Sequence, residues 1–289
     1  MRMLLVLLLL GVTAFAPAEA QDRTRRTIWS GPVGERQVVV DERWTPPFTD
    51  LLVTVRVSAP GKASTIEVST AGNSPDVVVP SGADRLVLIA ADMASIVDLN
   101  AELVADQFLV ARPSVSPTGR FIAYSRFQPR PSTDEDVLLV YDVSSSARLN
   151  RLPSNPQGMD FLRDVGLPVF PEWHTANQKY RGRNATADAP IETLRSAVVW
   201  ATETDFVFLA SRGAAADPDA SLAIHHVHVR GGGQPAVLRS HAIDAKVIGA
   251  PPLSARDIKV LDCAGSLCQV QIEWVPTQGL RAPSLDVKF

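Results

Sequence analysis

Three histidines in one short segment are the residues of this chain most able to do chemistry: His225, His226 and His228. Side chains of an extended strand alternate between its two faces, so we expect His226 and His228 to share a face and His225 to point the other way. Two imidazoles at this spacing can bind a metal ion if a third ligand arrives from elsewhere in the sequence. The candidates for that ligand are a carboxylate, His174 and His241. The alternative interpretation is that the histidines are polar, outward-facing positions of a strand.

A second group of polar residues lies in the segment 146–195, which is irregular and interrupts the pattern of strands. Carboxylates and an imidazole can act as general acid and general base where they converge in one pocket. The residues of this type are Asp160, Asp164, Glu172 and His174. Their spacing does not require them to converge, and the sequence contains neither a Gly-x-Ser-x-Gly nor a His-Glu-x-x-His motif. Hydrolase activity is therefore the alternative and not the leading hypothesis.

The segment 146–195 also contains large aromatic side chains. Trp173 and Tyr180 are costly to leave in water, so we expect part of the segment to pack on the body of the protein or on a partner. A long irregular stretch in a compact domain is either functional or disordered, so a solvated linker is the other interpretation. We predict that residues 159–181 form a contact surface. The expected binding residues are Asp160, Asp164, Trp173, His174 and Tyr180.

The elements that must position these residues are strands. The sequence Ser116–Gly119 reads Ser-Pro-Thr-Gly, a turn in which Pro117 sets φ and Gly119 can take a positive φ without steric cost. Phe121–Ser125 is rich in aromatic and β-branched residues, which is typical of a strand. Val137–Val143 is an almost continuous apolar run, typical of a strand that is buried on both faces. We expect these two strands to be antiparallel neighbours.

The stretch Val115–Tyr124 resembles the WD40-like repeat of TolB-type β-propellers, in which a Ser-Pro-Asp-Gly turn precedes an inner strand that ends in Ala-Tyr or Ala-Phe. Thr118 stands where that family usually has Asp. Leu139–Val143 is similar to the family's third strand, and Trp200–Leu209 resembles a second copy that lacks the Pro and the Gly. The copies begin 85 residues apart, which is two blade lengths of about 40–45 residues or one blade with an insertion. The resemblance implies partner contacts through loops at one end of a propeller, in envelope protein assemblies.

Residues 27–110 contain further short strands between turns. The expected strands are 36–41, 51–58, 64–69, 76–79, 85–91 and 94–99. We therefore predict an all-β, β-propeller-like fold with incomplete or divergent blades and one long irregular insertion, 146–195. In this organisation, residues 21–110 form an N-terminal β region of divergent blades or a sandwich, and residues 111–289 form the propeller-like region. The alternative is two packed β-sandwich-like regions.

The first 20 residues have the pattern of a secretory signal peptide, with Arg2, an apolar run over Leu4–Phe15 and the small-x-small sequence Ala18–Ala20. The apolar run is shorter than the roughly 20 residues that span a membrane. We predict an exported protein, periplasmic or secreted, with no transmembrane segment after cleavage. Apolar residues make up 46% and charged residues 20%, which indicates an ordered globule. The net charge of −3 and the lack of a basic stripe argue against nucleic acid as a partner.

The two cysteines lie at the ends of two predicted strands, 258–263 and 268–274, joined by a loop of four residues. In an exported chain, Cys263 and Cys268 at this spacing indicate a disulfide that fixes the register of a hairpin. No Cys-x-x-Cys motif supports a redox pair. The leading hypothesis is an exported, non-enzymatic binding or scaffold protein of the cell envelope, with a protein partner and no cofactor. The alternative is an exported hydrolase or metal-binding protein on a propeller scaffold.

Overall fold

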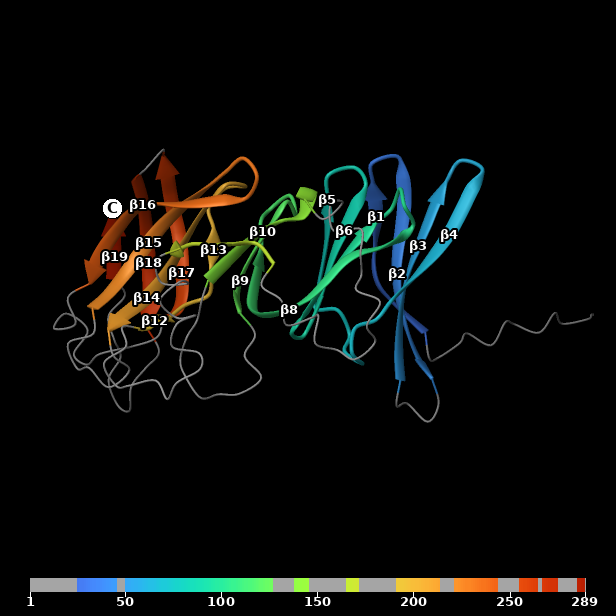
Figure 1. Ribbon diagram of the computed structural model, residues 1–289, viewed down its shortest axis with the longest axis horizontal. Coiled ribbons are helices and arrows are strands. Elements are labelled where there is room, and N and C mark those ends of the chain that lie inside the picture. Colours follow the sequence, from blue (N-terminus) through green and yellow to red (C-terminus); the bar gives the residue numbers. More distant parts are fainter. Residues whose placement is uncertain are drawn as a thin grey trace, which may run out of the picture.

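The computed structural model describes the residues 25–45, 50–126, 138–145, 165–171, 191–213, 221–243, 255–264, 267–274 and 285–288. The predicted signal peptide, residues 1–20, lies outside these ranges. The described chain consists of strands, numbered β1 to β19, and short connections (Figure 1). None of its elements is a helix with the length and apolar character needed to cross a membrane.

The first sheet contains four consecutive antiparallel strands: β1 (Arg25–Val33), β2 (Arg36–Thr45), β3 (Asp50–Ala59) and β4 (Lys62–Val68). Its side chains alternate as the sequence predicts. Val53 and Val55 are fully buried on one face of β3, whereas Arg56 is exposed on the other. The strands expected at 36–41, 51–58 and 64–69 are therefore confirmed, with longer bounds.

The second and third sheets are joined by one long strand. The strands are β5 (Val77–Ser81), β6 (Arg85–Ala90), β7 (Met93–Asp98), β8 (Leu103–Val115), β9 (Phe121–Arg126), β10 (Leu138–Asp142) and β11 (Leu167–Pro168). The first part of β8 pairs with β7 and its last part pairs with β9. Within the second part the register shifts between Ala111 and Ser114, where Arg112 has a φ of 48°. The predicted boundary between residues 110 and 111 thus falls inside β8.

The fourth and fifth sheets complete the described chain. They contain β12 (Ile191–Leu194), β13 (Val199–Trp200), β14 (Asp205–Gly213), β15 (Ser221–Arg230), β16 (Gln234–Ile243), β17 (Ala255–Ala264), β18 (Leu267–Trp274) and β19 (Leu285–Lys288). The turn before β9 belongs to the third sheet and the turn before β14 to the fourth. The 85 residues between the two repeat-like copies are therefore one blade with an insertion.

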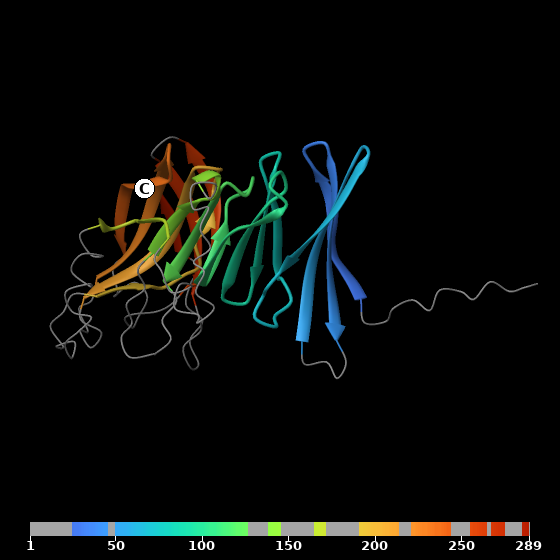
Figure 2. The same ribbon diagram turned by 45° about the vertical axis from the view of Figure 1, so that its right-hand side comes forward.

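Consecutive sheets pack face to face and follow one another in chain order, with the first and last at opposite ends (Figures 1 and 2). Each junction buries a hydrophobic cluster. Representative members are Val40, Val55 and Leu86 at the first junction, Ile89, Phe108 and Tyr141 at the second, Phe121, Val140 and Phe206 at the third, and Leu209, Ile224 and Val270 at the fourth. Every side chain of β10 is buried because its two faces lie in two different clusters, as the apolar run predicts.

The edge strands of the sheets also follow one another: β1 lies against β5, β8 against β13, and β13 against β17. This is the arrangement of propeller blades, and the described residues form five of them. The outer faces of the two terminal blades are hydrophilic. On the first, Asp41 accepts hydrogen bonds from Arg25, Thr27 and Arg56; on the last, Lys259 pairs with Glu273.

Candidate functional site

The three histidines lie on β15 and obey the predicted alternation. His226 and His228 lie on the face that β15 turns toward the fifth blade, together with Ile224. His225 points toward the third blade, where its ring stacks on Phe208 at 5.1 Å and its Nδ1 lies 2.8 Å from the Oγ of Ser240. The expectation that these are outward-facing positions is wrong for His225 and His226, which are buried because both faces of β15 are covered by neighbouring blades.

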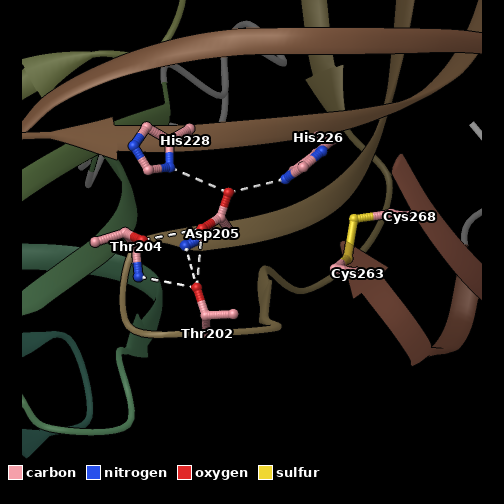
Figure 3. Close-up of polar contacts among 7 residues, drawn as sticks. All are labelled: Thr202, Thr204, Asp205, His226, His228, Cys263 and Cys268. Atoms are coloured by element: carbon pink, nitrogen blue, oxygen red, sulfur yellow. Dashed lines mark hydrogen bonds and ion pairs between the residues drawn. A yellow bond between two sulfur atoms is a disulfide. The ribbon is translucent and has the colours of Figure 1, made fainter. Parts of the chain in front are cut away.

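A carboxylate on the adjacent strand meets both same-face histidines. Asp205 is the first residue of β14 and lies opposite His228 in the antiparallel register. Its Oδ1 is 3.1 Å from Nε2 of His226 and 3.1 Å from Nδ1 of His228 (Figure 3). The side chain of His226 is fully buried, that of Asp205 is 16% exposed and that of His228 is 37% exposed. The cluster therefore runs from the interior of the junction to its rim.

The other carboxylate oxygen closes the turn that precedes β14. Oδ2 of Asp205 accepts hydrogen bonds from the hydroxyls of Thr202 and Thr204, both at 2.9 Å (Figure 3). The hydroxyl of Thr202 in turn accepts hydrogen bonds from the backbone N–H groups of Asp205 and Thr204. Burial alone raises the pKa of Asp205, but the hydrogen bonds from the two threonines and the two histidines outweigh it and hold the pKa below its ordinary value. Asp205 is therefore ionised at neutral pH.

The arrangement of the cluster bears on the predicted metal site. Across the described ranges, no group of three or more His, Cys, Asp or Glu side chains is placed to hold a metal ion. One nitrogen from each of His226 and His228 is directed at the same oxygen of Asp205. His241 lies on β16 opposite Ile224, which is two residues before His226 on β15. His174 lies outside the described residues. Metal binding by His226 and His228 stays a prediction.

Glu203, two residues before Asp205, connects two blades. Oε1 of Glu203 accepts a hydrogen bond from the hydroxyl of Ser116 at 2.7 Å, and its Oε2 accepts one from the backbone N–H of Thr118 at 2.8 Å. The predicted turn is confirmed, since Gly119 donates to the carbonyl of Ser116 and has a φ of 76°. The turn that begins the third blade is thus fastened to the turn that begins the fourth.

The predicted disulfide closes the hairpin of the fifth blade. Cys263 and Cys268 are opposite each other in the register of β17 and β18 and are bonded (Figure 3). The strands extend one pair further, to Ala264 and Leu267, so the expected four-residue loop is wrong and only two residues connect them. Cys268 is buried in the same hydrophobic cluster as Val207 and Ile224. Val207 lies two residues after Asp205 on β14, and Ile224 lies two residues before His226 on β15.

The residues predicted to form a contact surface or a hydrolytic pocket lie outside the described residues. These are Asp160, Asp164, Glu172, Trp173, His174 and Tyr180. Phe170, in the described part 165–171, packs its ring edge-on against Phe208 at 6.0 Å and His225 at 5.2 Å. The predicted roles of the six residues therefore stay predictions. Sequence reasoning missed Asp205 and Glu203, which the fold places at the centre of the described polar contacts.

The fold and this polar cluster define an all-β, propeller-like protein. No protein-family model matches the chain, and no curated protein matches it. Among solved structures it is similar to Hsv2 of Kluyveromyces lactis, with 11% identity over 75% of this chain and 73% of that one at a TM-score of 0.30. A fragment of HIRA shares 12% identity over 75% of this chain and 53% of that one, at a TM-score of 0.32. Acylaminoacyl peptidase of Pyrococcus horikoshii shares 9% identity over 86% of this chain and 35% of that one, at a TM-score of 0.33. TM-scores this low indicate only weak structural similarity. The fold is therefore assigned from the order and packing of the sheets.

Proposed function

We propose that this is an exported, non-enzymatic binding or scaffold protein of the cell envelope. The observation that carries the proposal is the way in which the strongest chemical cluster of the described chain is used. Both oxygens of Asp205 are occupied by side chains of the same blade. These four hydrogen bonds fasten the turn before β14 to the strands β14 and β15. Their arrangement supports a structural role for the blades and a binding role for the connections.

The contact surface in this proposal is the segment 159–181, with Trp173 and Tyr180 as its anchors. The described residues before and after these aromatic side chains, 165–171 and those from 191 on, pack into the blades. Val169 is buried in the cluster between the third and fourth blades, and β12 pairs with β14. A segment held at both ends by adjacent blades can present side chains to a partner without loosening the scaffold. TolB-like membership and a periplasmic location are part of the same proposal.

The test is capture of envelope proteins by the mature chain, residues 21–289, with and without a deletion. The structure limits the deletion to 172–190, because β11, Val169 and Phe170 take part in the sheet and its core. The deleted protein should keep its melting temperature and its circular dichroism but lose the captured partner. The double variant Trp173→Ala and Tyr180→Ala should reproduce that loss, and Leu238→Ala, an exposed apolar position on β16, serves as the matched control. Undiminished capture by the deleted protein contradicts the proposed surface.

Location is tested separately by expressing the full chain and a form that starts at residue 21. The full chain should be recovered in the periplasmic or secreted fraction in a shortened form, whereas the form without residues 1–20 should stay in the cytoplasm. Recovery of both forms in the cytoplasm contradicts the exported part of the proposal and leaves the binding part standing.

A further inference from the structure

A cavity of about 120 Å³ lies between the first and second blades. Its walls come from β2, β3 and β4 of the first blade and from the turn between β7 and β8 of the second. Its apolar lining comes from Val57, Ala59 and Leu99. Its charged lining consists of two cations, Arg36 and Lys62, and one carboxylate, Glu102. Among the lining residues, positive charge therefore exceeds negative charge by one.

The carboxylate of Glu102 already pairs with one of these cations. Nζ of Lys62 lies 2.6 Å from Oε1 of Glu102. The hydrogen bond from Lys62 is the main cause of the lowered pKa of Glu102; a hydrogen bond from Ser64 and the charges of Lys62 and Arg36 add to it. These three residues form a cradle that holds a carboxylate in its ionised state.

Arg36 is fixed in place before any ligand arrives. Its guanidinium donates hydrogen bonds to the carbonyl of Ala83 and to the side chain of Asn100. Both acceptors are neutral, so the charge of Arg36 is not cancelled by them. A cation that is oriented in advance binds an anion without a further loss of side-chain entropy.

Glu102 is held in a strained conformation. Its φ is 55°, which residues other than glycine rarely adopt. The turn does not depend on its carboxylate, because the backbone N–H groups of Asn100 and Ala101 donate to Asp98. The side chain of Glu102 is 30% exposed, so it can leave the cradle for solvent while the turn stays closed.

The size of the cavity limits what it can hold. An apolar cavity of about 150 Å³ binds benzene, which has six heavy atoms. With the side chain of Glu102 in place, a volume of 120 Å³ accommodates about five heavy atoms, and more space opens when that side chain leaves. A carboxylate on a two-carbon stem has five heavy atoms, and the lining includes both charged and apolar side chains to receive it.

We propose that this cavity binds a propionate-sized carboxylate, supplied by a glutamate side chain or a chain end of a partner protein, and that Glu102 occupies the cradle when the partner is absent. The lining residues all lie between positions 36 and 102, far in the chain from residues 159–181. Deletion of residues 172–190 should leave it intact, so failure here and failure of the proposed contact surface are distinguishable.

The experiment is a titration of the mature chain with propionate and, separately, with propionamide, followed by NMR shifts of the amides of Asn100 and Glu102. Propionate should saturate and propionamide should not. Glu102→Gln removes the resident competitor and should tighten propionate binding about fivefold, the upper range for an exposed ion pair. Lys62→Met should abolish saturation. Lys259→Met, at an exposed lysine that also pairs with a glutamate, is the matched control and should bind as the unchanged chain does.

Peptides identify the source of the carboxylate. One acetylated peptide ends in a free alanine, a second is the same peptide amidated, and a third is amidated with an internal glutamate. The first or third should compete with propionate and the second should not. Propionate binding without competition by either peptide overturns the assignment to a protein partner. Equal shifts with propionate and propionamide, or unchanged binding in Lys62→Met, overturn the site itself.

Discussion

The turns that begin the third and fourth blades occupy corresponding places and are closed by different chemistry. In the third blade the turn depends on residues that restrict the backbone: Pro117 sets one φ, Gly119 takes a positive φ, and the N–H of Gly119 bonds to the carbonyl of Ser116. The hydroxyl of Ser116 adds one side-chain bond, from the N–H of Phe121. In the fourth blade neither proline nor glycine is present. There, the N–H groups of Ala201 and Thr202 bond to the carbonyl of Asp205, and the hydroxyl of Thr202 and the carboxylate of Asp205 add the side-chain bonds that hold the turn.

The difference shows how a repeat can lose its recognisable sequence and keep its geometry. Proline and glycine restrict the backbone directly, so their effect can be read from the local sequence. A side chain that closes a turn through hydrogen bonds does the same work with ordinary residue types. Glu203 connects the two solutions, since it bonds to Ser116 and Thr118 of the other turn. Substitutions in each turn separate backbone closure from side-chain closure.

The largest effect is expected at the backbone-closed turn, from Gly119→Val. A Cβ at this position would collide with the carbonyl oxygen of Pro80 and approach Cγ1 of Val79 to 3.0 Å, and the φ of 76° is unfavourable for a β-branched residue. Strain and overpacking together should lower the free energy of unfolding by about 3–5 kcal/mol. Urea denaturation followed by tryptophan fluorescence measures this loss.

The matched control for that substitution is Gly232→Ala, in the turn between β15 and β16. Gly232 has a similar φ of 79°, but a Cβ there would meet nothing within 4 Å. It should cost only about 1 kcal/mol, the penalty of the backbone conformation alone. Equal losses in the two variants would mean that contact with the second blade contributes nothing at Gly119.

The strands and the first turn could be predicted because their causes are local. Short apolar segments between turns located β2, β3 and β4, and the run Val137–Val143 indicated a strand buried on both faces, which β10 confirms. The pairing of Cys263 with Cys268 followed from their spacing within a hairpin. In each case the information lies within about ten consecutive residues, the length of one strand or turn.

The centre of the polar cluster could not be predicted in the same way. Asp205 meets His226 and His228 only through the register of β14 and β15. The sequence indicated both strands, but the connection between them leaves the register open, and a shift by one residue would turn Asp205 to the other face. The contact of Glu203 with Ser116 spans 87 residues and two blades. It depends on how the blades pack, which no local pattern encodes.

The next largest effect is expected in the side-chain-closed turn, from Asp205→Ala. This change removes the acceptor of four side-chain hydrogen bonds, two of them from histidines. Hydrogen bonds to a charged group contribute more than neutral ones, so the loss in unfolding free energy should be about 2–3 kcal/mol. Asp205→Asn keeps the shape and one acceptor oxygen and should cost about half as much. Equal stability of Asp205→Ala and the unchanged chain would show that the cluster does not close the turn.

The same turn should weaken in acid. The pKa of Asp205 in the folded chain is below the ordinary value of 3.8. A carboxyl group whose pKa is lowered by folding stabilises the folded state above its ordinary pKa, and this contribution is lost as the pH falls through the lowered value. The difference in stability between the unchanged chain and Asp205→Asn should therefore shrink as the pH falls below about 4. Asp41, whose pKa is lowered to about 2, is unaffected by the substitution and cancels in the comparison.

A smaller effect is expected where the two turns meet, from Glu203→Gln. Glutamine retains one acceptor but places an N–H group against either the hydroxyl of Ser116 or the N–H of Thr118, so one charge-assisted bond is lost. The expected cost is about 1–1.5 kcal/mol, because the site is only partly buried. A double-mutant cycle with Ser116→Ala should give a coupling energy of at least about 0.5 kcal/mol. Additive losses would show that the two turns are closed independently.

The smallest effects separate the two mechanisms most clearly, through Thr202→Val and Pro117→Ala. Valine has the shape of threonine but cannot bond to Asp205, so the folded state should lose about 1 kcal/mol. Pro117→Ala should lose a similar amount, about 0.5–1 kcal/mol, because the unfolded chain gains freedom. The two losses should respond differently to acid. That of Thr202→Val depends on the ionised carboxylate of Asp205 and should diminish below about pH 4, whereas that of Pro117→Ala should not change. The same response in both variants would mean that the Thr202 hydroxyl acts on the backbone alone, and that the carboxylate is not part of the closure.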